Sequence, residues 1–235
     1  TGPYASKPGF ASVCEGVGGL RYVNGFPDGP PVRPNLSLGD TLAGLHTALG
    51  IVMALVRRLK DPGGRGQVID TALYEAVFNM LEGVVPEFDG GGVIREPSGS
   101  TLTGIVPTNT YRCSDGKFII IGANGDSIFK RLCDKMGQPA MGDDPRFADN
   151  AGRVAHEPEI DAAITAWTGS LDSATALTML EEARVPSGPI YSVADMVVDP
   201  HFRARGLFEE VEVNGEPLKI PSMVPKFSET PGRTD

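Results

Sequence analysis

The stretch NLSLGDTLAGLHTALG, residues 35–50, places a single aspartate, Asp40, at the start of a long apolar run. Leucine, valine and methionine side chains recur on nearly every side until Leu59, so the pattern predicts a buried helix from about Asp40 to Lys60. Basic residues at the end of this run complement the negative C-terminal end of the helix dipole. We therefore expect this helix to organise the first part of the chain.

Asp40 admits two interpretations. Aspartate is a favoured N-cap, and a carboxylate at a helix N-terminus is stabilised by the helix dipole. The second interpretation is chemical, because Leu36, Leu38 and Leu42 would reduce the hydration of the carboxylate and Gly39 would leave room for another molecule. A carboxylate of this kind can attack an activated acyl group. The residues alone leave both interpretations open.

The composition restricts the function classes. The 235 residues suffice for one large domain or two small ones, and the net charge of -9 argues against broad nucleic-acid binding. The three cysteines contain no CxxC pair, which predicts a reducing, cytoplasmic setting rather than a disulfide framework. The most apolar run, Leu42 to Val56, is shorter than the roughly 20 residues that span a bilayer, so a core helix is predicted and no membrane partner.

Composition shifts divide the chain into four predicted segments. They are residues 1–85, a large domain that contains Asp40; residues 86–105, a Gly-rich linker or active-site loop; residues 106–198, a small α+β domain; and residues 199–235, a segment that returns to the large domain. The second segment combines three consecutive glycines with a Ser/Thr/Gly run. The chain begins without Met and both ends read as loops, so we expect an internal piece of a longer protein.

Local patterns predict elements inside these segments. A second helix should run from Asp70, as its N-cap, to Gly83. The turn Ser114-Asp115-Gly116 should separate two strands, and Asn214-Gly215 indicates a later hairpin. The predicted strands are 108–113 and 117–123, and the predicted helices lie near 126–136, 157–169 and 173–184, the last with Ser173 as N-cap.

Several catalytic motifs are absent from the sequence. It contains no GxxxxGK[ST], no GxSxG and no HExxH. The histidines His46, His156 and His201 lie far apart without an acidic or cysteine cluster at ligand spacing, so no metal site is predicted. His46, inside the apolar run, is interpreted as a core histidine with its hydrogen bonds satisfied.

A series of motifs resembles the family III CoA-transferases, the CaiB/BaiF family of the formyl-CoA and carnitine CoA-transferase type. The motifs are TGPYASKPGF, GGL, DGPPVRP, LGDTLAGLHTALGIVMAL, GRGQVID, DDPRFADNAGR and VPSGPIYSVADMVVDP. The resemblance covers essentially the whole chain. It implies an α/β fold, with part of a large CoA-binding domain plus a small α+β domain, and an interlocked homodimer in the full-length protein. The N-terminal Rossmann-like half of that family is not in this sequence.

The resemblance also implies the site. Asp40 would be the nucleophile, coenzyme A thioesters and carboxylic acids would be substrates, and no cofactor would be permanently bound. The CoA-lining stretch would comprise Pro8, Gly9, Phe10 and Ala11. The loop that shields the intermediates would include Gly99, Ser100, Thr101 and Gly104.

Two alternatives to CoA transfer remain. The α-methylacyl-CoA racemases of the same fold use a histidine 30 positions before the aspartate, where this chain has Phe10, which carries no proton. Ala11 stands where formyl-CoA transferase has a glutamate, which disfavours that substrate pair and leaves small dicarboxylates as the guess from the family. The second alternative is a non-catalytic fragment for folding or dimerisation, and the piece alone is not expected to hold CoA tightly.

Overall fold

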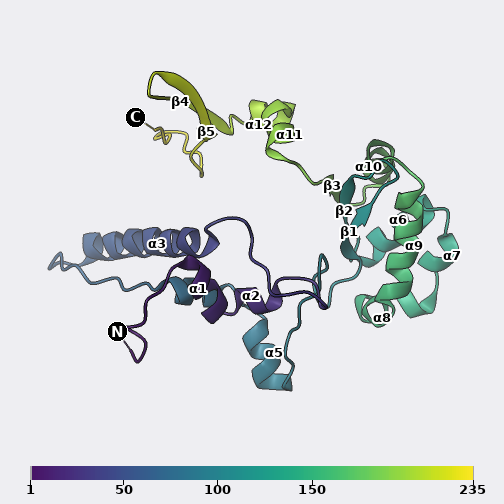
Figure 1. Cartoon of the computed structure of the whole chain (residues 1–235), viewed down its shortest axis with the longest axis horizontal. Helices are drawn as coiled ribbons and strands as arrows, with labels where there is room; N and C mark the ends of the chain where they lie inside the picture. Colours follow the sequence, from purple (N-terminus) through teal and green to yellow (C-terminus); the bar gives the residue numbers. More distant parts are fainter. Residues whose placement is uncertain (1, 235) are drawn as a thin grey trace.

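The computed structural model describes residues 2–234 and shows two regions joined by an extended linker, followed by a C-terminal hairpin (Figure 1). The first region is helical. Its helices are α1 (Ala11–Val17), α2 (Leu20–Val23), α3 (Leu38–Lys60), α4 (Leu73–Asn79) and α5 (Val84–Gly91).

Helix α3 is formed as predicted, but the prediction that it is buried is wrong. Gly39 is its only buried residue, and the side chains of Leu45 and Leu59 are 63% and 86% exposed. The cause is length: α3 has 23 residues, about 35 Å at 1.5 Å per residue, whereas its neighbours α1 and α4 have 7 residues each. Two short helices cover only part of the long one, so much of its apolar surface faces solvent.

By length and composition α3 would be able to cross a membrane, and it is the one helix of residues 2–234 that would. The helix is therefore longer than the apolar run from which a core helix was predicted. Core helices of soluble proteins meet the same criterion. The helix follows its N-cap Ser37 and ends at Lys60. Asp40 lies in its first turn and His46 further along it.

Two predictions between residues 70 and 105 need correction. Helix α4 begins at Leu73, so Asp70 is not its N-cap; the Glu75 carboxylate instead accepts the backbone N–H of Ala72 at 3.1 Å. The glycine triplet, predicted as linker, ends helix α5, because Gly92 adopts φ +67° at its C-terminus. Helices α1 and α2 also lie in a Gly-rich stretch where no helix was predicted.

The two strands and three helices predicted within residues 108–184 are formed, each within two residues of its predicted ends. Strands β1 (Thr108–Arg112), β2 (Phe118–Gly122) and β3 (Ser187–Pro189) form an antiparallel sheet in that order. The surrounding helices are α6 (Asp126–Lys135), α7 (Pro139–Gly142), η1 (Pro145–Phe147), α8 (Asn150–Ala155), α9 (Glu157–Gly169) and α10 (Ser173–Glu182). The N-cap of α10 is Asp172, whose side chain accepts from Thr175 N, and not Ser173 as predicted.

This domain encloses its own core. The core includes Tyr111, Ile119, Phe129, Ile160 and Leu180, each at most 2% exposed. Because residues from the sheet and from three helices meet here, the apolar faces of these short elements cover one another.

Among residues 2–234, Arg153 on α8 is the only fully buried cationic side chain. Its guanidinium donates to the carbonyls of Val106 (3.0 Å), Phe147 (2.9 Å) and Asn124 (2.6 Å) and pairs with Asp126 at 2.8 Å. A buried charge is tolerated only when its donors are satisfied. Arg153 therefore ties the linker, η1 and the start of α6 together.

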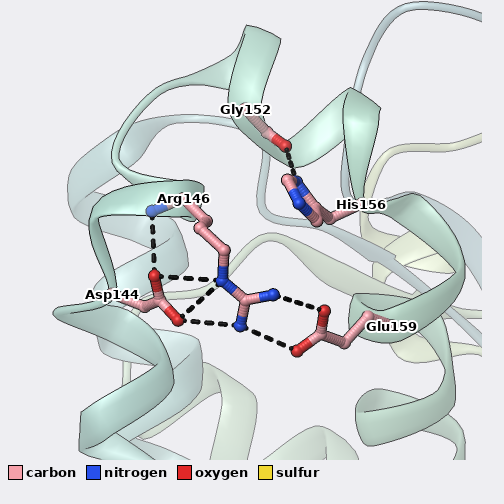
Figure 2. A network of polar contacts seen from close by, with 5 residues as sticks. All are labelled: Asp144, Arg146, Gly152, His156 and Glu159. Atoms are coloured by element: carbon pink, nitrogen blue, oxygen red, sulfur yellow. Dashed lines mark hydrogen bonds and ion pairs between the residues drawn. The ribbon is translucent and has the colours of Figure 1, made fainter.

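A second polar network lies on the outside of the same helices (Figure 2). Arg146 pairs with Asp144 at 2.8 Å and with Glu159 at 2.9 Å, while His156 Nδ1 lies 2.8 Å from the carbonyl oxygen of Gly152. Because these ion pairs are solvent-exposed, they contribute little to stability.

The C-terminal part follows an extended segment and lies apart from the small domain (Figure 1). It consists of α11 (Val193–Val198), α12 (Pro200–Ala204), β4 (Phe208–Val213) and β5 (Glu216–Pro221). The predicted hairpin is confirmed: Val213 pairs with Glu216, and Asn214 and Gly215 have φ +55° and +84°. Positive φ at both turn residues is typical of a type I′ turn.

Candidate active site

Asp40 occupies the third position of α3 and is not its N-cap. The N-cap is Ser37, whose side chain makes no capping hydrogen bond. The Asp40 side chain is exposed, so its apolar neighbours do not bury it, and it has no hydrogen bond or ion pair among residues 2–234. The capping interpretation is therefore wrong, and the carboxylate is free to meet another molecule.

The capping bond comes instead from Glu15 on α1. Its Oε1 accepts the backbone N–H of Gly39 at 3.3 Å, and the side chain is fully buried. Arg33 holds the same carboxylate, with Nη2 3.1 Å from Oε1 and Nε 3.0 Å from Oε2. Glu15 was not predicted as a site residue, because its partner Gly39 lies 24 residues away and no local pattern links the two.

The predicted CoA-lining stretch lies at the beginning of α1. Phe10 is the N-cap of this helix and is 82% exposed, and Pro8 and Gly9 are exposed as well. Ala11 is buried against α3: a Cβ on Gly39 would lie 3.5 Å from the Ala11 Cβ. The space beside Gly39, predicted to be open, is thus filled by α1, and this close contact brings the stretch 8–11 to the turn that carries Asp40.

His46 lies six residues, or about one and two-thirds turns, beyond Asp40 along α3. Its Nδ1 is 2.8 Å from the carbonyl oxygen of Leu42, and its Nε2 is 3.2 Å from Asn79 Oδ1. Both ring nitrogens have partners, as predicted, but His46 is only half-buried on a largely exposed helix, so the prediction that it is a core histidine is wrong.

The predicted substrate loop is a closed turn within the linker. Ser98 and Thr101 exchange side-chain-to-carbonyl hydrogen bonds at 2.9 and 3.0 Å. Gly99 adopts φ +71°, donates to the carbonyl of Gly25 at 2.8 Å and lies against the Phe26 ring, where an added Cβ would be 3.0 Å away. A glycine is required at this position, because both its conformation and the ring disfavour a side chain.

Residues of the small domain form hydrogen bonds with Ser100 and Gly104 of this loop. Asn150 Nδ2 donates to the Gly104 carbonyl at 2.8 Å, and Ser100 Oγ donates to Asn109 Oδ1 at 2.6 Å. Asn109 in turn donates to Asp161 on α9 at 2.7 Å, and the Tyr111 hydroxyl donates to the same carboxylate at 2.5 Å. The loop is therefore held by a chain of hydrogen bonds that reaches the small-domain core.

The charge around Asp161 is negative. Burial, and then the hydrogen bond to Asp161, raise the pKa of the Tyr111 phenol, so it remains a donor at neutral pH. Burial, and then the charge of Asp161, also raise the pKa of the Glu157 carboxyl. Asp161 accepts from both Asn109 and Tyr111, and this pair of hydrogen bonds orients Asn109.

The structure does not bring all predicted site residues together. The linker after α5 runs from the helical region to the small domain, away from α3 (Figure 1). The substrate loop therefore lies on the linker, whereas Asp40 and the stretch 8–11 lie at the α1–α3 contact. The described residues contain no group of three or more His, Cys, Asp or Glu side chains that could hold a metal ion.

Asp40 is thus an exposed carboxylate in the first turn of a helix, a kind of group that can act as a nucleophile toward an activated acyl group. The profile of CoA-transferase family III matches residues 1–235, and the chain belongs to this family.

Three relatives define the similarity. The chain is 44% identical to succinyl-CoA–D-citramalate CoA-transferase of Chloroflexus aurantiacus, over 100% of this chain and 58% of the relative. It is 39% identical to the succinyl-CoA–L-malate CoA-transferase alpha subunit of the same organism, over 99% and 54%. A crystal structure of a CaiB/BaiF family protein from Brucella suis superposes with a TM-score of 0.79 at 31% identity, over 98% of this chain and 59% of that one. The chain thus spans just over half the length of these relatives.

Proposed function

We propose that the complete gene product containing this chain transfers coenzyme A from an acyl-CoA donor to a carboxylic acid acceptor, with Asp40 as nucleophile. The observation that carries the proposal is the exposed Asp40 carboxylate, which no other side chain engages, at the turn where α3 meets the stretch 8–11. Family membership supports the reaction class.

The first half of the reaction loads the enzyme. A carboxylate oxygen of Asp40 attacks the thioester carbonyl, the C–S bond breaks, and a mixed anhydride and CoA thiolate form. The thiolate then attacks the aspartyl carbonyl of the anhydride. This step releases the donor carboxylate and leaves an aspartyl-CoA thioester.

The second half reverses these steps on the acceptor. The acceptor carboxylate attacks the aspartyl-CoA carbonyl, which expels the thiolate and forms a new anhydride. The thiolate attacks the acceptor acyl carbon, giving the new acyl-CoA and regenerating the Asp40 carboxylate. No oxidant, metal or net proton transfer is needed.

We propose small dicarboxylates as the substrate class, because the names of two relatives specify succinyl-CoA with citramalate or malate. We also propose that the protein acts as a homodimer in the cytoplasm. The exposed apolar side chains of α3 and the separation of the loop from Asp40 support a second subunit, and the three free cysteines fit a reducing compartment.

The loop 98–104 would shield the anhydride and thioester from water. Its bonds to Asn109 and Asn150 support this role, since they would hold the loop in one conformation. A racemase reaction is disfavoured, because Phe10 at the N-cap of α1 has no transferable proton.

The test is to replace Asp40. Asp40→Asn keeps the shape of the side chain but cannot form the anhydride, so transfer in the complete gene product should fall on the order of 10³-fold or more. Asp70→Asn is the matched control, an exposed aspartate outside the α1–α3 contact. Hydroxylamine or borohydride trapping should place a mass adduct on the Asp40 peptide. Normal transfer by Asp40→Asn would refute the proposal, and solvent deuterium at the α-carbon would indicate the racemase.

A further inference from the structure

We propose that Glu15 is a positioning residue for Asp40: its buried carboxylate fixes the first turn of α3 against the α1 helix that carries the predicted CoA-lining stretch. This inference rests on the proposed function and adds to it a residue that contacts neither the acyl group nor CoA.

The geometry links the nucleophile to α1 through one backbone group. Gly39 N–H donates to Glu15 Oε1 at 3.3 Å, and Asp40 is the next residue in the same helical turn. Ala11, one turn before Glu15 on α1, lies against the same glycine. Two α1 side chains, Ala11 and Glu15, therefore contact Gly39. A shift of the Asp40 backbone away from α1 would break the Glu15 hydrogen bond or the Ala11 packing contact.

A local cap would not provide this link. An N-terminal N–H group of a helix is usually satisfied by the N-cap side chain, but Ser37 makes no such bond in α3. The acceptor comes from another helix, so the orientation of the first turn depends on α1. Any displacement of α1, for example when a ligand binds at residues 8–11, is transmitted to Asp40.

The charge on Glu15 indicates that the position is more than a packing site. Glu15 is fully buried, and only Arg33 approaches its Oε2 closely, at 3.0 Å; Arg21 Nε is 3.9 Å away. Neither Oε2 nor Arg21 Nε has a hydrogen-bond partner in the described residues. Burial of a carboxylate has a desolvation cost that an apolar side chain would not have, and here the ion pair with Arg33 opposes that cost.

Arg33 completes the arrangement. Its Nη2 donates both to Glu15 Oε1 and to the carbonyl oxygen of Leu36, each at 3.1 Å. The segment that enters α3 is thus bound to the same carboxylate as the helix itself. Glu15 and Arg33 together determine where the chain turns into the helix, and hence the position of Asp40.

The expected effect is on turnover rather than on substrate binding. Misplacement of a reacting group by about 1 Å costs on the order of 10²-fold in rate. In the complete gene product, Glu15→Ala should lower kcat about 10- to 100-fold with KM for acyl-CoA changed less than about 3-fold. Glu15→Gln, which keeps an acceptor for Gly39 N–H, should recover much of kcat.

The control separates positioning from stability. Val77→Ala removes a fully buried side chain on α4 in the same region and should lower Tm comparably, with kcat unchanged. Equal kcat losses in Glu15→Ala and Val77→Ala at equal loss of Tm would overturn the inference, as would a normal kcat in folded Glu15→Ala.

A second route covers the case in which Glu15→Ala fails to fold. Arg33→Met keeps an apolar stem and frees Glu15 to move, so kcat and the rate of aspartyl-CoA formation should fall together while KM is retained. A normal kcat together with a normal rate of aspartyl-CoA formation in folded Arg33→Met and folded Glu15→Ser would refute the inference. If Asp40→Asn is inactive while these variants are normal, only the role of Glu15 fails; if Asp40→Asn is active, the proposed function itself fails.

Discussion

The small domain and the helical region of this chain differ in how far their apolar side chains are buried. In the small domain Ile119 and Ile160 are fully buried, whereas on α3 the side chain of Leu45 is 63% exposed. Both regions have apolar patterns that predict burial. An apolar pattern therefore shows which face of a helix favours burial. How much of that face is buried within one chain depends on the lengths of the helices that pack against it.

Buried charge separates the two regions as well. Arg153 in the small domain has three carbonyl acceptors and a carboxylate partner. Glu15 in the helical region is also fully buried, yet one of its oxygens has no hydrogen-bond partner among the described residues. Arg153 is satisfied by carbonyls and a carboxylate of its own domain, whereas Glu15 combines an ion pair to Arg33 with a hydrogen bond to the turn that carries Asp40.

The largest effect on stability is expected at Arg153. Arg153→Met would leave the Val106, Phe147 and Asn124 carbonyls without this donor, and a buried group left unsatisfied costs about 1–3 kcal/mol, so the small domain should lose at least about 3 kcal/mol of unfolding free energy. Urea titration followed by the fluorescence of Trp167, which packs against the core, measures this. A loss below about 1 kcal/mol would mean that the network is not a determinant of the domain.

The next prediction compares one aliphatic truncation in each region. Ile160→Ala should cost about 2–5 kcal/mol, because it opens a cavity in a closed core. Leu45→Ala in this chain should change stability by no more than about 0.5 kcal/mol, since the side chain is already solvated.

The same pair tests the proposed dimer by thermal denaturation. In the complete gene product, a second subunit over α3 would raise the cost of Leu45→Ala toward that of a core position. An equally small cost in both forms would contradict coverage of α3 at this point.

How much of the structure was predictable depends on the range of the interactions. The turns Ser114–Gly116 and Asn214–Gly215 are local, so their hairpins were predicted correctly. Strand β3 was missed, because it contains only Ser187, Gly188 and Pro189 and forms solely by pairing with β2. Local chemistry determines turns, whereas pairing partners determine short edge strands.

The candidate site divides in the same way. Asp40 was identified from its local setting, and its capping role was overestimated because capping preferences consider only neighbours in sequence. Glu15, 24 residues earlier, took that role through a tertiary contact. The hydrogen bonds from Ser100 to Asn109 and from Asn109 to Asp161 were equally unpredictable, since the bonded residues lie 9 and 52 positions apart in the chain.

A smaller effect is expected at the junction between the two regions. Ser100→Ala removes the hydrogen bond from the loop to Asn109, a contribution of about 1 kcal/mol, or about fivefold in the population of the ordered loop. The ratio of acyl-CoA hydrolysis to CoA transfer should rise by about that factor, because a looser loop admits water. Ser170→Ala, which removes an equally exposed serine hydrogen bond remote from the loop, is the control and should leave the ratio unchanged. An unchanged ratio in Ser100→Ala would contradict the shielding role.

The smallest effect concerns acid, and it is expected in the small domain. The Ser173 hydroxyl, at 2.7 Å from Asp115, lowers the pKa of that carboxyl below its ordinary value of 3.8. Because the folded state binds this proton less readily than the unfolded state, Asp115 stabilises the fold above about pH 4, and that contribution is lost as the pH falls through the lowered pKa. Asp115→Asn, and to a lesser degree Ser173→Ala, should therefore flatten the decline of small-domain stability between about pH 5 and pH 3 in urea titrations. A slope identical to that of the unmodified chain would show that the turn and α10 are not coupled through this carboxylate, and that the closed core alone stabilises the domain.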